Sequence, residues 1–142
     1  MIKKFNLGYL KEILKIEEKA FPKTSYDIPT FLYYAELYSD TFLVYLEKSS
    51  NKIGGYIIFT IDGHIISLAV DHLLKRIGIG TQLVSEVLRR SKDKARVEVR
   101  EGNKVARMFY KKLGFIPVDV IQKYYEDEDA IVMIYDIGAD PY

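Results

Sequence analysis

Residues 75–81 read Lys75-Arg76-Ile77-Gly78-Ile79-Gly80-Thr81, and this glycine-rich stretch joins two apolar segments of different periodicity. Residues 65–70 form a continuous strand-like run, whereas residues 83–88 carry apolar side chains at helical spacing. The glycines therefore fall where a strand ends and a helix begins. Backbone N–H groups at a helix start lack an acceptor within the helix, and glycine lets an anion approach them closely. The pattern predicts a turn that binds a phosphate group.

Two common phosphate-binding motifs do not fit this turn. A nucleoside-triphosphate loop needs Lys-Ser or Lys-Thr after its last glycine, but Thr81-Gln82 follows Gly80. A dinucleotide fingerprint needs a third glycine where this chain has Leu83. Because a lone Gly-x-Gly also marks tight loops, the turn by itself leaves a purely structural role open.

A second pattern lies about twenty residues downstream, at the spacing of one helix and one strand. Residues 96–100 read Arg-Val-Glu-Val-Arg, and residues 103–115 contain Asn-x-x-Ala-x-x-Phe-Tyr-x-x-x-Gly-Phe. With the glycine turn, these motifs resemble the acetyl-CoA-binding core of the GCN5-related N-acetyltransferase (GNAT) superfamily. Within it, the chain is most similar to the RimI/Ard type of protein N-terminal acetyltransferase, which also carries a Tyr-Tyr pair followed by Glu-Asp-Ala. This chain supplies Tyr124-Tyr125 and residues 128–130, and the early Phe21-Pro22 extends the resemblance over nearly its whole length.

The resemblance implies an α/β (α+β) chain with the GNAT fold, a central mixed, mostly antiparallel sheet of about seven strands flanked by about four helices. We expect one domain over residues 1–142. The patterns predict strands at 2–5, 41–47, 53–61, 64–70, 95–99, 116–125 and 130–136, and helices at 6–21, from about 27 to 39, after the glycine turn, and at 104–113.

Composition excludes several classes of function. The 21 basic and 20 acidic residues leave a formal charge of +1, so we expect no binding to nucleic acid or to an anionic membrane. The chain has no cysteine and two histidines, which excludes a thiol nucleophile and predicts an enzyme without a metal. No apolar run approaches the length of a membrane span and no signal peptide is recognised, so the expected location is cytoplasmic.

The implied reaction is attack of an amine on the thioester of acetyl-CoA, with coenzyme A as the leaving thiolate. Glu98 is the predicted general base, acting directly or through a water, because Val97 and Val99 point to the opposite face of its strand. The residues alone leave a simple ion pair with Arg96 or Arg100 open. The resemblance assigns the catalytic role, since RimI-like enzymes carry a glutamate at the matching motif position.

Tyr110 is the predicted general acid, because a phenol is neutral at pH 7 and can protonate a thiolate. It shares a helical face with Asn103, Ala106 and Arg107. Packing against Phe109 is the alternative, and the surrounding motif favours catalysis.

By resemblance, the cofactor acetyl-CoA is held by three segments. Asn103 contacts it, the strand Leu68, Ala69, Val70 offers backbone hydrogen bonds to pantetheine, and the turn holds the pyrophosphate through Arg76, Ile77, Gly78, Ile79, Gly80 and Thr81. Asn103 is equally suited to cap its own helix, and the two roles are compatible.

Five residues lie in segments that resemble the acceptor-peptide walls of N-terminal acetyltransferases: Phe21, Pro22, Tyr26, Tyr124 and Tyr125. Ordinary packing is the alternative for each of them taken alone. The acidic run 126–129 is either a solvated turn or an attraction for a cationic substrate. His64, where the third hairpin strand starts, is a minor candidate for the acceptor channel.

The predicted activity is transfer of an acetyl group to the α-amino group of protein or peptide N-termini, directly in a ternary complex. An α-amino group loses its proton more readily than lysine by about 2.5 pKa units, or about 3.4 kcal/mol, which suits a weak base. A GNAT enzyme for lysine or a small amine, and a non-catalytic acyl-CoA-binding or partner-binding protein, are the alternatives. The acceptor sequence, the oligomeric state and any ribosome or auxiliary-subunit association stay open.

Overall fold

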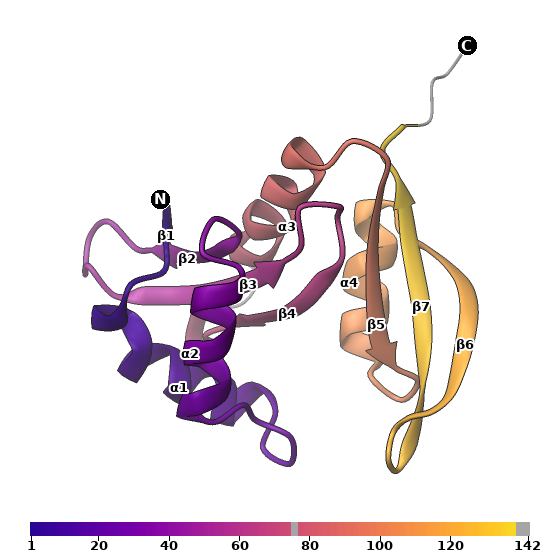
Figure 1. Cartoon of the computed structure of the whole chain (residues 1–142), viewed down its shortest axis with the longest axis horizontal. Helices are drawn as coiled ribbons and strands as arrows, with labels where there is room; N and C mark the ends of the chain where they lie inside the picture. The colour runs from indigo at the N-terminus through magenta and orange to yellow at the C-terminus, as the bar shows by residue number, and fades with distance from the viewer. Residues whose placement is uncertain (75–76, 139–142) are drawn as a thin grey trace. The chain divides into compact units, whose positions relative to one another are not determined.

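The computed structural model describes residues 1–74 and 77–138, which contain seven β-strands and four α-helices (Figure 1). The strands are β1 (Ile2–Lys4), β2 (Phe42–Leu46), β3 (Ile53–Phe59), β4 (Ile65–Val70), β5 (Lys94–Arg100), β6 (Ile116–Tyr125) and β7 (Glu128–Asp136). The helices are α1 (Leu10–Ala20), α2 (Ile28–Leu37), α3 (Ile79–Arg90) and α4 (Lys104–Leu113), with short 3-10 helices η1 (Leu7–Tyr9) and η2 (His72–Leu74). These counts match the expectation. Among the described residues, none of the helices has the length and apolar character needed to cross a bilayer.

The described strands form two sheets where one central sheet was expected. One sheet has the order β1-β2-β3-β4 and the other β5-β7-β6. In the second sheet β7 is central, and Glu98 of β5 lies opposite Val132 in an antiparallel register. His64 does not start β4 as predicted but makes an isolated parallel bridge to Arg96 of β5.

The chain divides into two compact units, residues 1–60 with 66–86, and residues 61–65 with 87–142. His64 and Glu98 both belong to the second unit. The single domain expected over residues 1–142 stays a prediction.

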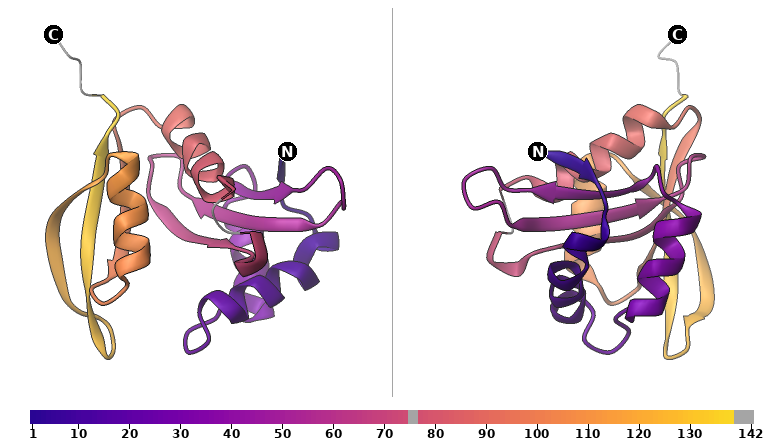
Figure 2. Two further views of the ribbon diagram at one scale, coloured as in Figure 1. Left: turned by 180° about the vertical axis from the view of Figure 1, so that it is seen from behind. Right: turned by 60° about the vertical axis from the view of Figure 1, so that its left-hand side comes forward.

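The first unit is built on the four-stranded sheet, with α1 and α2 on one face and α3 on the other (Figure 2). Phe31, Phe42 and Tyr56 are fully buried between the sheet and the helix pair, where their rings contact one another. Asn6 and Asp27 act as helix caps as predicted, although the helix expected from residue 6 begins as the 3-10 helix η1 and becomes α-helical only at Leu10. Asn6 accepts a hydrogen bond from Gly8 N–H at η1, and Asp27 accepts one from Thr30 N–H at α2.

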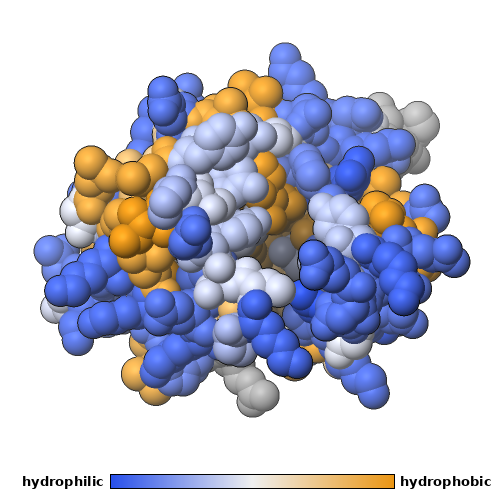
Figure 3. All heavy atoms as spheres, turned by 60° about the horizontal axis from the view of Figure 1, so that its bottom comes forward, coloured by the Kyte–Doolittle hydropathy of each residue, from blue (hydrophilic) through white to orange (hydrophobic). Residues whose placement is uncertain are grey.

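Helix α2 leaves part of its apolar surface exposed. Ile28, Leu32 and Leu37 are 48%, 40% and 51% exposed, while Phe31 on the same helix is buried. Apolar surface interrupts the hydrophilic surface in the space-filling view (Figure 3). The helix therefore contributes one face to the core and leaves other apolar side chains in solvent.

The second unit packs α4 along one face of the β5-β7-β6 sheet (Figures 1 and 2). Tyr110 and Phe115 are buried at this contact, and the Phe115 ring lies 5.6 Å from that of Tyr135 on β7. Asn103 caps the start of α4, and Gly114 ends it with a φ of 108°, a conformation that favours glycine.

Candidate active site

The second unit brings His64 and Glu98 into direct contact. The imidazole Nε2 of His64 lies 2.8 Å from Glu98 Oε1 and 3.0 Å from Oε2. The Glu98 side chain is only 5% exposed, whereas that of His64 is 34% exposed. The pair therefore joins a buried carboxylate to an imidazole that is partly exposed to solvent. His64, a minor candidate from the sequence, thus contacts the predicted base, and its role stays a prediction.

Three other side chains surround the same carboxylate or its backbone. Arg96 donates to Glu98 through Nε and Nη2 at 3.3 and 3.4 Å. The Tyr124 hydroxyl donates to Glu98 Oε1 at 3.3 Å, and the Tyr125 hydroxyl donates to the Glu98 carbonyl at 3.1 Å. The ion pair with Arg96, which the sequence left open as an alternative role for Glu98, is present. Catalytic and acceptor-wall candidates from separate motifs thus meet at Glu98.

These contacts set the charge of Glu98. Burial raises the pKa of its carboxyl, but hydrogen bonds and charge interactions with His64 and Arg96 outweigh burial and hold the pKa below its usual 4.5. The carboxylate is therefore ionised at neutral pH and is a weak base.

Gly63 places His64 beside β5. Its carbonyl accepts a hydrogen bond of 2.9 Å from Arg96 N–H, and its φ is 101°. A Cβ atom here would lie 2.0 Å from the Lys94 carbonyl oxygen. Only glycine allows the two backbones to approach this closely, so Gly63 determines the register that sets His64 against Glu98.

Tyr110 lies on α4 in the same unit as Glu98. Burial raises the pKa of its phenol well above the usual 10, so the side chain stays protonated at neutral pH. Its ring contacts Phe109 and Phe115 at 5.0 and 5.2 Å, as the packing alternative required. Within residues 1–74 and 77–138, no hydrogen bond engages its hydroxyl. Its role as the general acid stays a prediction.

The glycine turn leads into α3 as predicted. Gln82 N–H donates to the Gly78 carbonyl at 3.0 Å, so the N–H groups of Ile79, Gly80 and Thr81 precede the first intrahelical bond. Gly78 has a φ of 87°, and a Cβ built on it would meet nothing within 4 Å. Open space thus faces a glycine at a helix start, which fits an anionic group. Arg76, also predicted to contact the pyrophosphate, lies outside the described residues.

The other cofactor candidates lie on regular elements. Leu68, Ala69 and Val70 form the end of β4, and Ile77 is 61% exposed just before α3. Asn103 accepts a hydrogen bond of 3.0 Å from Ala106 N–H, so the capping alternative is present in the structure. Its contact with the cofactor stays a prediction.

The acceptor-wall candidates divide between the units. Phe21 and Tyr26 pack against the core of the first unit, and Pro22 is exposed there, whereas Tyr124 and Tyr125 belong to the second. The guanidinium of Arg100 lies 4.2 Å from the Tyr125 ring centroid. It also donates to Asp127 at 2.9 Å and to Glu128 at 3.3 Å. Arg100 therefore offsets the acidic turn, which weakens that turn as an attraction for cationic substrates.

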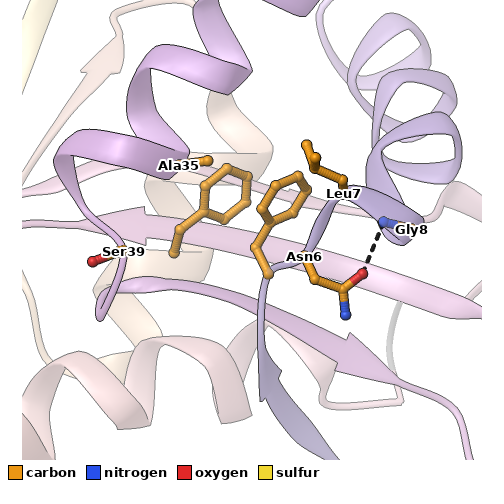
Figure 4. A pocket seen from close by; sticks show the side chains of 7 residues that line it. Asn6, Leu7, Gly8, Ala35 and Ser39 are labelled. Atoms are coloured by element: carbon orange, nitrogen blue, oxygen red, sulfur yellow. Dashed lines mark hydrogen bonds between the residues drawn. The ribbon is translucent and has the colours of Figure 1, made fainter.

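The first unit also contains an open depression of about 540 Å³ (Figure 4). Asn6 Oδ1 accepts the Gly8 N–H at its edge, and the lining comprises Phe5, Asn6, Leu7, Gly8, Ala35, Ser39 and Phe42. None of these side chains titrates. The depression therefore offers no acid or base, unlike the cluster at Glu98.

Comparison with known proteins gives the family. The Acetyltransferase (GNAT) family model matches residues 10–115. The chain is 37% identical over 143 residues to an uncharacterized N-acetyltransferase of Methanocaldococcus jannaschii, over 94% of this chain and 90% of that protein. The chain belongs to the GNAT acetyltransferase family. It is also 31% identical over 153 residues to an N-alpha-acetyltransferase of Sulfurisphaera tokodaii, over 93% of this chain and 90% of that protein.

The fold class of this GNAT acetyltransferase is confirmed by a solved relative. The crystal structure of Ard1 from Thermoplasma volcanium has a TM-score of 0.83 to this chain at 25% identity, over 96% of each chain. The RimI/Ard resemblance stated from the motifs is therefore confirmed.

The motifs of this GNAT chain did not predict the contact of His64 with Glu98. The sequence signal for it was the Asp-Gly turn that precedes His64, because such a turn brings a strand end back against the sheet. An Asp-Gly pair predicts a turn, but it does not predict which strand the residue after the turn will contact. Only the bridge between His64 and Arg96 shows which carboxylate the histidine meets.

Proposed function

We propose that this protein transfers the acetyl group of acetyl-CoA to the α-amino group of protein N-termini. The observation that carries the proposal is the contact of the accessible His64 imidazole with the buried Glu98 carboxylate. Tyr124 shares this carboxylate, which puts an acceptor-wall candidate beside a group that can take a proton. The relative from Sulfurisphaera tokodaii is named an N-alpha-acetyltransferase, which supports the same substrate class.

The weak basicity of Glu98 favours an N-terminal amine over lysine. Its pKa lies below 4.5, so it gains little by accepting a proton from a strongly basic group. An α-amino group has a pKa near 8, against about 10.4 for lysine, so part of the α-amine is neutral before it meets the enzyme. A site with this base therefore suits the less basic amine.

In the proposed reaction, the Glu98–His64 pair accepts the proton that the amine loses as its nitrogen attacks the thioester carbonyl. The C–N bond forms and the C–S bond breaks. Tyr110 donates its phenolic proton to the departing sulfur, and solvent exchange then returns the protons to their starting positions. Proton transfers of this kind contribute about 10² to 10⁴ in rate.

The chain's own backbone supplies the anion site for the donor. We assign the pyrophosphate to the N–H groups of residues 79–81 and the open face of Gly78, with pantetheine along Leu68–Val70. Direct transfer is supported by the absence of cysteine in all 142 residues and by the two candidate serines, Ser67 and Ser85, whose hydroxyls are hydrogen-bonded to the Tyr56 hydroxyl and the Thr81 carbonyl. Neither serine has a histidine–carboxylate arrangement nearby in the sequence that would activate it as a nucleophile.

The test uses purified protein, acetyl-CoA and two matched peptides that differ only in the N-terminal group and at one internal position. One peptide has a free N-terminus and no lysine, and the other has a blocked N-terminus and one internal lysine. Coenzyme A release and product mass are measured for each. We expect the first peptide alone to gain one acetyl group, and the enzyme's own mass to stay unchanged before acceptor is added.

Acetylation of lysine alone would contradict the proposed substrate class. If neither peptide is acetylated although acetyl-CoA binds, the result would point to a small-amine acceptor, a missing partner or a non-catalytic protein. A mass gain on the enzyme in the absence of acceptor would contradict direct transfer.

A further inference from the structure

Glu17 is a buried carboxylate that the proposed reaction does not use. It lies near the end of α1 in the first unit and is 1% exposed, although its neighbour Glu18 is exposed. Burial raises the pKa of Glu17, and hydrogen bonds from Tyr56 and Tyr26 offset part of that rise. A buried acid is costly unless its oxygens are hydrogen-bonded, so its partners indicate its purpose.

Both carboxylate oxygens have partners, and the partners come from different segments. Oε2 accepts the backbone N–H of Tyr26 at 2.9 Å, and Oε1 accepts the Tyr56 hydroxyl. The Tyr56 oxygen also lies 2.8 Å from Ser67 Oγ. One chain of hydrogen bonds therefore connects α1, the segment before α2, β3 and β4, all within the first unit.

The two ends of this series of hydrogen bonds lie at the two segments of the first unit that are predicted to bind substrate. Tyr26 belongs to residues 21–27, which carry the acceptor-wall candidates and have no regular secondary structure. Ser67 directly precedes Leu68, where the pantetheine segment begins. The Tyr26 ring is partly buried against Phe31 and Tyr34, at 5.7 and 5.5 Å.

We propose that Glu17 is a positioning residue for the acceptor, which holds residues 21–27 in the conformation that receives the peptide. The inference rests on the proposed function. The backbone N–H of Tyr26 finds its acceptor in Glu17, so the carboxylate fixes a segment that lacks a helix or strand ladder. Through Tyr56 and Ser67, the same carboxylate sets that segment relative to β4.

The chemistry of the network predicts which substitutions it tolerates. In Glu17→Gln, the amide oxygen still accepts Tyr26 N–H, and the amide nitrogen donates to the Tyr56 oxygen, whose proton passes to Ser67 Oγ. In Glu17→Leu, the size is similar but Tyr26 N–H loses its acceptor. Glutamine should therefore replace glutamate and leucine should not.

The experiment compares steady-state kinetics and amide hydrogen exchange for wild type, Glu17→Gln, Glu17→Leu and the exposed control Glu18→Leu. We expect Glu17→Leu to raise the peptide KM about tenfold, equivalent to about 1.4 kcal/mol. Its acetyl-CoA KM should not change, and exchange at Tyr26 N–H should accelerate. Glu17→Gln and Glu18→Leu should match wild type in all three measurements.

An unchanged peptide KM together with faster exchange at Tyr26 would overturn the positioning role. Equal loss in Glu17→Gln and Glu17→Leu would also overturn it, because it would show a need for charge. If Glu17→Leu does not fold, Tyr56→Phe removes the link between Glu17 and Ser67 while keeping the ring, and it should raise the peptide KM alone. If wild type acetylates no N-terminus, the proposed function fails separately, and exchange at Tyr26 still tests the network.

Discussion

His64 Nε2 and Glu98 Oε1 lie 2.8 Å apart although 34 positions separate the two residues in the chain. The contact couples an accessible imidazole to a carboxylate that Arg96 and Tyr124 also engage. The proposed base is thus composed of two residues, and its kinetics should differ from those of a lone glutamate.

Replacing either His64 or Glu98 should remove most of the rate enhancement that the proposed general base supplies. His64→Gln and Glu98→Gln should each lower kcat by about a hundredfold, as expected for loss of a general base. The double variant should fall little further, because the two residues act as a unit. Steady-state kinetics with a free N-terminal peptide measures this, with His72→Gln in η2 as the matched control. Multiplicative losses in the double variant would show that the residues act independently.

Tyr110→Phe should lower turnover by about a hundredfold or more and leave acetyl-CoA affinity intact, because it removes the proton donor but keeps the buried ring. Calorimetric binding and single-turnover kinetics separate the two effects. Tyr135→Phe, in the same unit, is the control and should retain full turnover. Full turnover in Tyr110→Phe would end its assignment as the acid.

Gly63→Ala should damage the site through the backbone. Its Cβ would fall 2.0 Å from the Lys94 carbonyl oxygen at a φ of 101°, so β5 and the turn must separate. Strain of this kind costs on the order of 1–3 kcal/mol, and the His64–Glu98 contact should be lost with it. Chemical unfolding and kcat report the two effects. Gly138→Ala, whose Cβ would meet ordinary contacts at 3.5 Å, should behave as wild type.

Gly78→Val should weaken acetyl-CoA binding by more than about tenfold, because the added side chain would occupy the open face where a phosphate approaches the N–H groups of α3. Titration calorimetry measures the affinity. Gly78→Ala is the control for backbone strain, since it imposes a Cβ at the same positive φ but adds only a methyl group to the open face. A folded valine variant with wild-type affinity would show that the pyrophosphate lies elsewhere.

Glu98 and Glu17 should change the free energy of unfolding in opposite directions as pH rises. The pKa of Glu98 is lowered on folding, so its contribution is present above 4.5 and is lost as pH falls through its folded value. The pKa of Glu17 is raised, so its contribution is present below 4.5 and is lost as pH rises through its folded value. Urea unfolding of wild type and the two Glu→Gln variants, from about pH 3 to about pH 7, measures both. Slopes of the same sign would contradict these assignments.

Local signals in the sequence predicted much of the fold. Helix α4 and strand β6 begin and end at the predicted residues, and Asn6, Asp27 and Asn103 act as caps. These features depend on side chains within a few positions of one another, so periodicity and capping preferences suffice. The GNAT motifs then supplied the family, which composition alone did not.

The sequence by itself determined the helices and strands, the glycine turn and the candidate acid and base, because a short stretch of residues specifies each of them. The tertiary structure decided which side chains meet. It set His64 against Glu98 through the close approach of Gly63, directed Arg100 to the turn at Asp127, and buried Glu17 between segments far apart in the chain. Such contacts depend on sheet register and on packing between distant segments, and no local pattern specifies which carboxylate a given histidine will face.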